Sequence, residues 1–110
     1  MGLAISEKHG YTMLTCQEAI IESDDLRELR NKVSELCSGG TKRIAVELAE
    51  GTFLNSMSVG ILLQCHMQVD DRDGEFAIIH ANREDEDLLD TLNLTCLLKT
   101  YASVDELATD

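Results

Sequence analysis

The chain of 110 residues contains no proline and no tryptophan, and aromatic residues make up only 4% of it. It also lacks internal repeats, low-complexity segments and proline-rich stretches, so nothing in the sequence marks a linker between domains. A chain of this length buries roughly two thirds of its unfolded surface, which is enough for one hydrophobic core. We therefore expect residues 1–110 to form a single domain.

Basic residues are scarce, because 9 Lys and Arg stand against 21 Asp and Glu, which gives a formal net charge of -12. A nucleic-acid-binding protein neutralises phosphates with clustered Lys and Arg, so this balance argues against a nucleic-acid partner. The charge favours a partner protein with a basic surface. The alternative is that the acids only keep a small domain in solution.

Long apolar runs are absent as well. No stretch approaches the length of a membrane span, and Ser6, Glu7 and Lys8 interrupt the apolar N-terminus, so we expect no membrane span and no targeting core. The predicted location is the cytoplasm. Residues 1–6 also fit the permissive N-myristoylation pattern, but their alternation is better explained by a first strand.

Metal-binding spacings are missing, and we expect neither a metal nor a cofactor. The cysteines are far apart, include no C-x-x-C pair and have no closely spaced histidine to complete a zinc site. Reduced core thiols are therefore expected at Cys16, Cys37, Cys65 and Cys96. Asp71–Gly74 does not fit a calcium loop, because Val69 and His80 would occupy the first and twelfth ligand positions.

Apolar periodicity predicts an alternation of strands and helices. Short or alternating apolar runs indicate strands at residues 3–7, 11–15, 44–48, 76–80 and 96–101. A turn at His9-Gly10 joins the first two. Apolar spacings of three and four residues with capping residues indicate helices at about 23–38, 56–70 and 82–92, and a terminal turn after Ser103. This order predicts an α/β fold, a mixed four- to five-stranded sheet covered by about four helices.

The acidic run Glu84–Asp87 lies in the first turns of the helix expected at 82–92. Acidic side chains stabilise a helix N-terminus, so a solvated helix start is the simpler explanation. A divalent-metal site is the alternative reading of the same four residues.

Ser56 lies where the strand at 44–48 and its loop give way to an apolar helix. A phosphate at a helix start meets free N–H donors and the positive end of the helix dipole. A period of 3.6 residues predicts which side chains of this helix face the core: Val59, Leu62, Leu63, His66 and Val69. The side chains predicted to face outward are Met57, Ile61, Gln64 and Gln68. Outward Met57 and Ile61 beside Ser56 indicate a partner surface.

Residues 55–60, N-S-M-S-V-G, resemble the D-S-[ST]-G-[LV]-G signature of STAS domains in the anti-sigma factor antagonist family. Ser56 occupies the position of the serine that is phosphorylated in partner switching. The aliphatic residue and the second glycine are kept. Asn55 stands in place of the aspartate, Met57 in place of a second hydroxyl residue, and Ser58 in place of the first glycine. The resemblance implies one STAS domain over residues 1–110.

The family's G-x-[LI]-D motif after the second strand does not match residues 16–22, where Glu18 and Glu22 are the acidic candidates for kinase contact. The resemblance implies Ser56 as the phosphoacceptor, with Ser58 as a second candidate. Its implied partner-binding residues are Glu18, Glu22, Asn55, Met57, Ser58 and Ile61.

The resemblance also implies partners and a mechanism. A serine kinase of the histidine-kinase-like ATPase fold, often itself an anti-sigma factor, and a PP2C-type phosphatase would set the phosphorylation state. The unphosphorylated form would bind a partner, and phosphorylation would release it, because a phosphate adds about -1.5 to -2 charges. The output would be sigma-factor control or non-transcriptional control such as biofilm or exopolysaccharide regulation.

Three alternatives stay open. An enzyme would use Ser56 or Cys65 as nucleophile, but no G-x-S-x-G elbow is present, and Cys65 and its candidate base His66 point about 100° apart on a helix; His80 is the other candidate base. A constitutive scaffold or a transporter-associated STAS subunit would use the same helix without phosphorylation. Ser56 alone could simply be an N-cap worth about 1 kcal/mol.

Overall fold

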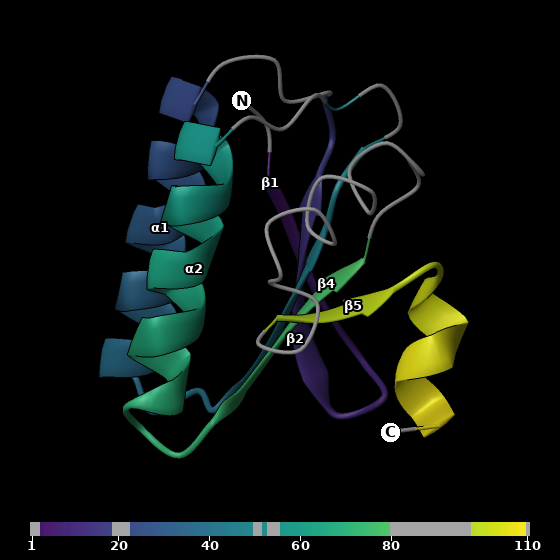
Figure 1. Cartoon of the computed structure of the whole chain (residues 1–110). Helices are drawn as coiled ribbons and strands as arrows, with labels where there is room; N and C mark the ends of the chain where they lie inside the picture. The colour runs from purple at the N-terminus through teal and green to yellow at the C-terminus, as the bar shows by residue number, and fades with distance from the viewer. Residues whose placement is uncertain (1–2, 19–22, 50–51, 53–55, 80–97, 110) are drawn as a thin grey trace.

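The computed structural model describes residues 3–18, 23–49, 52, 56–79 and 98–109. Its elements, in order, are β1 (Leu3–Lys8), β2 (Tyr11–Cys16), α1 (Ser23–Ser38), β3 (Arg43–Glu47), α2 (Ser56–Asp70), β4 (Glu75–Ile79), β5 (Lys99–Tyr101) and the 3-10 helix η1 (Val104–Thr109). The strands form one sheet, and α1 and α2 lie side by side on one of its faces (Figure 1).

The first two strands form the predicted hairpin. His9 and Gly10 both have positive φ, 55° and 84°, as a two-residue turn between antiparallel strands requires. Glycine adopts this conformation without steric cost, and it occupies the second of the two positions. The hairpin makes β1 an edge strand and places β2 beside β3.

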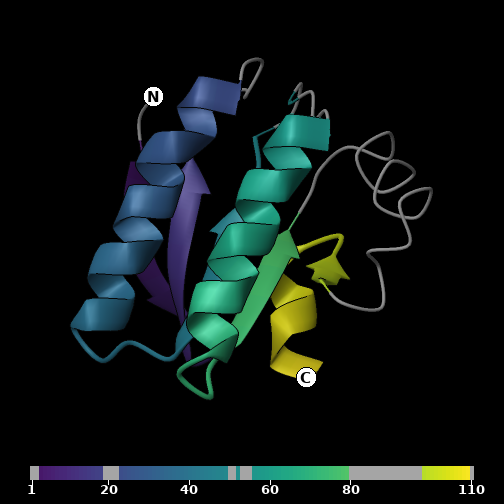
Figure 2. The same cartoon turned by 60° about the vertical axis from the view of Figure 1, so that its left-hand side comes forward.

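The sheet has the order β1-β2-β3-β4-β5, antiparallel between β1 and β2 and parallel from β2 to β5. Parallel neighbours need crossover connections, which α1 and α2 provide. Successive crossovers in one direction along the sheet, with the same hand, place both helices on the same face (Figure 2). The α/β class and the mixed sheet predicted from the sequence are confirmed.

The central strands of the sheet are buried on both faces. Between the sheet and the two helices lies the larger core, which includes Leu14, Leu29, Val33, Val46, Leu62 and Ile78. The opposite face carries a smaller cluster closed by η1, with Tyr11, Met13, Ala45, Ala77, Ile79 and Leu107. Since side chains alternate along a strand, burial of consecutive residues in β3 and β4 shows that both strands are covered on each side.

Some element boundaries differ from the prediction. β5 spans Lys99–Tyr101, shorter than the expected 96–101, and the helix expected at 82–92 lies outside the described residues. The terminal helical turn is a 3-10 helix. Its capping glutamate, Glu106, accepts a hydrogen bond at 2.7 Å from the N–H of Ala102.

Two glycines give a matched test of this packing. At Gly74, a Cβ would collide with the carbonyl oxygen of Lys42 and lie 2.8 Å from Cγ1 of Val69, whereas at Gly60 it would meet none of the described residues within 4 Å. Gly74→Ala should therefore lower the free energy of unfolding by about 1–3 kcal/mol, because backbone must shift. Gly60→Ala should raise it by about 0.5–1 kcal/mol, because alanine favours the helix. Urea denaturation measures both; equal effects would contradict the described approach of Gly74 to Lys42.

Candidate functional site

The candidate site lies at the edge of the sheet where the parallel strands end and α2 begins. β3 ends at Glu47, and the N–H of Leu48 donates a hydrogen bond of 2.8 Å to the carbonyl of Ile79, which continues the contact with β4. Thr52 is buried, and α2 begins at Ser56. The predicted junction between a buried strand and an apolar helix is confirmed.

Ser56 is exposed, whereas Ser58, two residues later, has 0% of its surface exposed. The first turn of α2 contains no acidic side chain, so no carboxylate of that turn offsets the positive end of the helix dipole beside Ser56. The N-terminal N–H groups of a helix lack intrahelical acceptors. This end of α2 is therefore suited to an anion, and Ser56, not Ser58, presents its hydroxyl to solvent.

The other predicted site residues are placed as follows. Met57 is 64% exposed, as expected. Glu18 is exposed just beyond β2, at the same edge of the sheet as Ser56, because β2 and β3 are parallel with Thr15 opposite Glu47. Asn55 and Glu22 lie outside the described residues.

The outward orientation predicted for Ile61 is wrong. Its side chain is only 7% exposed and belongs to the larger core. The prediction assumed one buried stripe facing the sheet, but α2 also packs beside α1, so a second side of the helix is covered (Figure 2). Ile61 is therefore a core residue and not a partner contact. His66 is half-buried, as expected for a rim residue, and its buried Nδ1 has no hydrogen-bond partner in the described structure.

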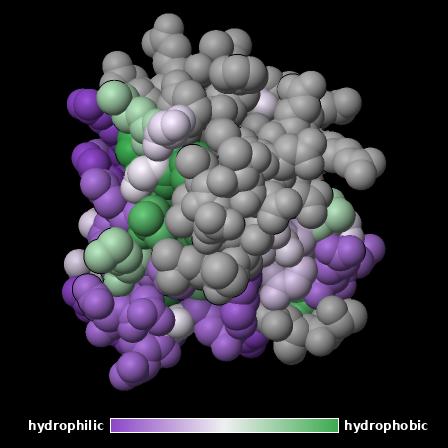
Figure 3. Space-filling view, in the orientation of Figure 1, coloured by the Kyte–Doolittle hydropathy of each residue, from purple (hydrophilic) through white to green (hydrophobic). Residues whose placement is uncertain are grey.

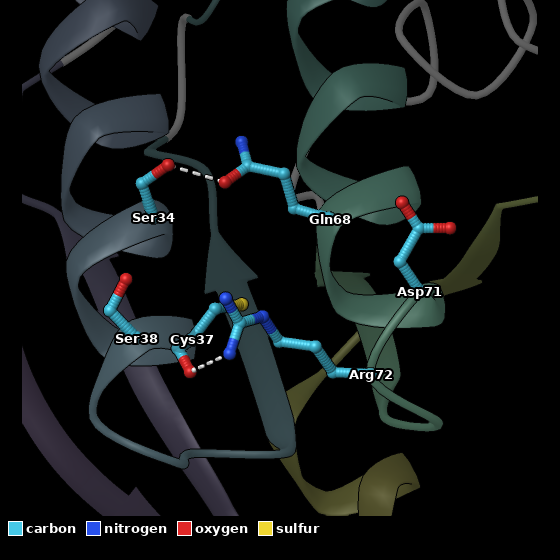
Figure 4. Close-up of a pocket in the computed structure, with 6 residues that line it drawn as sticks. All are labelled: Ser34, Cys37, Ser38, Gln68, Asp71 and Arg72. Carbon is cyan, nitrogen blue, oxygen red and sulfur yellow. Dashed lines mark hydrogen bonds between the residues drawn. The ribbon is translucent and has the colours of Figure 1, made fainter.

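Polar contacts join α1 to α2 along their shared side. Nη1 of Arg30 donates to Oε1 of Gln64 at 3.1 Å, and the hydroxyl of Ser34 donates to Oε1 of Gln68. One turn further, Nη1 of Arg72 donates to the carbonyl of Cys37 at 2.9 Å (Figure 4). These contacts could not be predicted from the sequence, because the paired positions are more than thirty residues apart.

A cavity of about 430 Å³ lies between α1 and α2, near the C-terminal ends of both helices (Figure 4). It is lined by Ser34, Cys37, Ser38, Gln68, Asp71 and Arg72. Gln68 is twelve positions after Ser56, which corresponds to about 18 Å along a helix. The cavity is thus remote from Ser56. Burial raises the pKa of the Cys37 thiol, with Arg72 partly opposing the shift, so this cysteine is protonated at neutral pH.

The described cysteines are buried free thiols, as predicted for Cys16, Cys37 and Cys65; Cys96 lies outside the described residues. Burial raises the pKa of Cys65 to about 12 and that of Cys16 to about 11. A thiol acts as a nucleophile through its thiolate, so this shift argues against Cys65 in that role. His80, the other base considered, is outside the described residues.

Within the described residues, no cluster of three or more His, Cys, Asp or Glu could hold a metal ion. The acidic run Glu84–Asp87 is outside them. None of the described helices is both long and apolar enough to cross a membrane.

Comparisons with known proteins agree on the architecture. The family model described as STAS domain matches residues 3–107. The protein TM1081, solved by NMR, superposes with a TM-score of 0.78 at 19% identity, over 96% of this chain and 85% of that one. The Bacillus cell fate determinant SpoIIAA, solved in its phosphorylated form, superposes with a TM-score of 0.71 at 11% identity, over 98% of each chain. A search of curated proteins found no match.

The raised thiol pKa values predict a loss of stability at high pH. In the unfolded chain a thiol ionises near pH 9.0, whereas folded Cys16 and Cys65 hold their protons to about pH 11 and 12. Above pH 9 the unfolded state binds fewer protons, so the free energy of unfolding should fall by up to about 1.4 kcal/mol per pH unit for each thiol.

Urea denaturation under reducing conditions from pH 8 to 11 measures this slope. Cys65→Ala serves as the control, since it removes one of the thiols whose pKa burial raises and leaves the Lys and Tyr titrations in place. The slope should be smaller in the variant. An identical slope in both proteins would contradict the assigned burial of Cys65.

Proposed function

The chain belongs to the STAS domain family, whose model matches residues 3–107, and we propose that it is a phosphorylation-controlled regulatory protein of a bacterial partner-switching pathway. In this proposal residues 1–110 act in the cytoplasm as one STAS domain of the anti-sigma factor antagonist type. The observation that supports it most is the exposed Ser56 at the N-terminus of α2, whose first turn contains no acidic side chain.

Ser56 is the proposed phosphoacceptor. A phosphate there adds about -1.5 to -2 charges at the positive dipole end of α2, where an anion is stabilised without unfolding the helix. Ser58 is a poor acceptor, because its side chain is fully buried and a kinase would need the start of α2 to open. SpoIIAA, which shares this fold, was itself solved in a phosphorylated form.

Partner release follows from the surroundings of Ser56. Met57, the next residue, is 64% exposed and offers an apolar contact to a partner, and exposed Glu18 lies at the same edge of the sheet. A phosphate inserted into that contact must be desolvated without a matching cation. A hundredfold loss of affinity corresponds to about 2.7 kcal/mol, which is within the range measured for one buried interfacial charge.

The proposed partners are those of the family. A serine kinase of the histidine-kinase-like ATPase fold would phosphorylate Ser56, a PP2C-type phosphatase would remove the phosphate, and the unphosphorylated chain would hold the partner. The formal net charge of -12 favours a partner that carries basic groups away from the part of the contact that meets Ser56. No catalytic group of this chain takes part, because the phosphate itself changes the affinity.

Phosphosite mapping and pull-downs from the native cells test this function. The wild type should carry phosphate at Ser56; Ser56→Ala should retain a kinase-like ATPase, and Ser56→Asp should lose it by roughly a hundredfold. Ser6→Asp is the matched control, since it adds the same charge at another exposed serine, on β1. Ser58→Ala should leave phosphorylation unchanged.

The opposite results are equally informative. If Ser56 carries no phosphate and the Ala and Asp variants retain identical partners, the chain is a constitutive binding module. Ser56 would then be only a helix cap.

A further inference from the structure

α2 carries almost no charge. The only Asp, Glu, Lys or Arg in its fifteen residues is Asp70, the last of them, although charged residues make up 27% of the chain. The neighbouring helix α1 has charged side chains in every turn. A helix on the surface of such an acidic protein normally turns charged residues to solvent, so the outer face of α2 requires an explanation.

The spacing of residues on that outer face is typical of a surface that packs against another helix. Ser56, Gly60, Leu63 and Met67 follow one another at intervals of four, three and four residues, the spacing of a coiled-coil stripe. Leu63 is half-buried, the other three residues are exposed, and Met67 is 55% exposed. Together with exposed Met57 they form a surface that we name the outer α2 face.

The surface is also shaped for close approach. Among the described residues, a Cβ at Gly60 would meet nothing within 4 Å, so the backbone of α2 is open to a partner at this position, and exposed Met57 and Met67 lie on the same helix. Methionine side chains adapt to irregular partners and are common on binding surfaces. Figure 3 shows hydrophobic green along this helix, bordered by hydrophilic purple on the α1 side and below.

The charged residues at the C-terminal end of the outer α2 face indicate which kind of partner can bind there. Asp70, Asp71 and Asp73 are all exposed just beyond Met67. Arg72, the cation among them, turns toward α1, where its guanidinium bonds to the carbonyl of Cys37 (Figure 4). The rim next to Met67 is therefore acidic, which requires basic groups on a partner and disfavours a second copy of this chain with its net charge of -12.

We propose that the outer α2 face is the docking site for an amphipathic helix of the partner protein, with an apolar stripe that packs over Gly60 and basic residues that meet Asp70, Asp71 and Asp73. This proposal rests on the proposed function and extends it. The contact runs about 16 Å from Ser56 to Met67, since a helix rises 1.5 Å per residue. A phosphate at Ser56 would weaken one end of this contact. At the other end, Asp70, Asp71 and Asp73 would bind the basic residues of the partner helix.

A synthetic peptide probe tests the chemistry directly. The probe is a 21-residue amphipathic helix with a leucine stripe and lysine elsewhere, titrated at about 0.15 M salt into the full isotope-labelled chain and followed by NMR. Binding should saturate and shift the amides of Gly60, Leu63 and Met67. The same peptide with glutamate in place of lysine should bind at least about tenfold more weakly.

Charge substitutions on the chain test where the peptide binds. Met67→Lys should raise the Kd for the lysine peptide at least about tenfold, because it buries a like charge in the contact. Ile5→Lys is the matched control, since Ile5 is 50% exposed on β1, and it should change the Kd by less than about twofold. Equal effects of the two variants, shifts confined to other surfaces, or equal binding of the two peptides would overturn the proposal.

The outcomes separate this proposal from the proposed function. If Met67→Lys weakens the peptide but the Ser56→Ala and Ser56→Asp variants retain identical partners in the pull-downs, the docking surface stands and phosphorylation control at its end fails. If Met67→Lys has no effect while the Ser56 variants behave as expected in the pull-downs, the docking surface fails and the phosphorylation switch stands.

Discussion

The burial of α2 against the sheet is the constraint on which the rest of the structure depends. Leu62, Cys65 and Val69 on its inner side have at most 1% of their surface exposed, and that packing fixes the rotation of the helix about its axis. Once the rotation is fixed, Ser56 faces solvent and Ser58 faces the interior, although the two hydroxyls are only two residues apart. The difference between an accessible serine and an inaccessible one is therefore a consequence of core packing.

The electrostatics of the site follow from the same arrangement. The parallel strands direct their carboxyl ends to one edge, and the helix that returns from β3 begins at that edge with its positive dipole end. Because the first turn of α2 supplies no carboxylate, a phosphate on Ser56 would be the first anion of that helix to meet this dipole. The acidic excess of the chain opposes the phosphate only at longer range, where salt screens it.

Much of this could be predicted from the sequence, since the hairpin, both described α-helices and the strand-to-helix junction each have a local signal. His9-Gly10 requires positive φ, and Ser56 precedes an apolar period of 3.6 residues. Ile61 was mispredicted because periodicity along one helix carries no information about a neighbouring helix. The cavity near Cys37 was missed for the same reason, since α1 and the turn after α2 build it jointly.

The two sides of α2 show why its composition is unusual for an acidic protein. Its inner side must be apolar to pack on the sheet, but nothing in the core requires Gly60 and Met67 to avoid charge, because both are exposed. Glycine within a helix costs about 0.5–1 kcal/mol relative to alanine. Within the part of the chain that the structure describes, an alanine Cβ at Gly60 would meet no neighbour, so the described core packing gives no compensation for that cost. In the proposed complex, a partner helix that approaches the backbone at Gly60 would supply the compensation, and Ser56 would lie within the same contact.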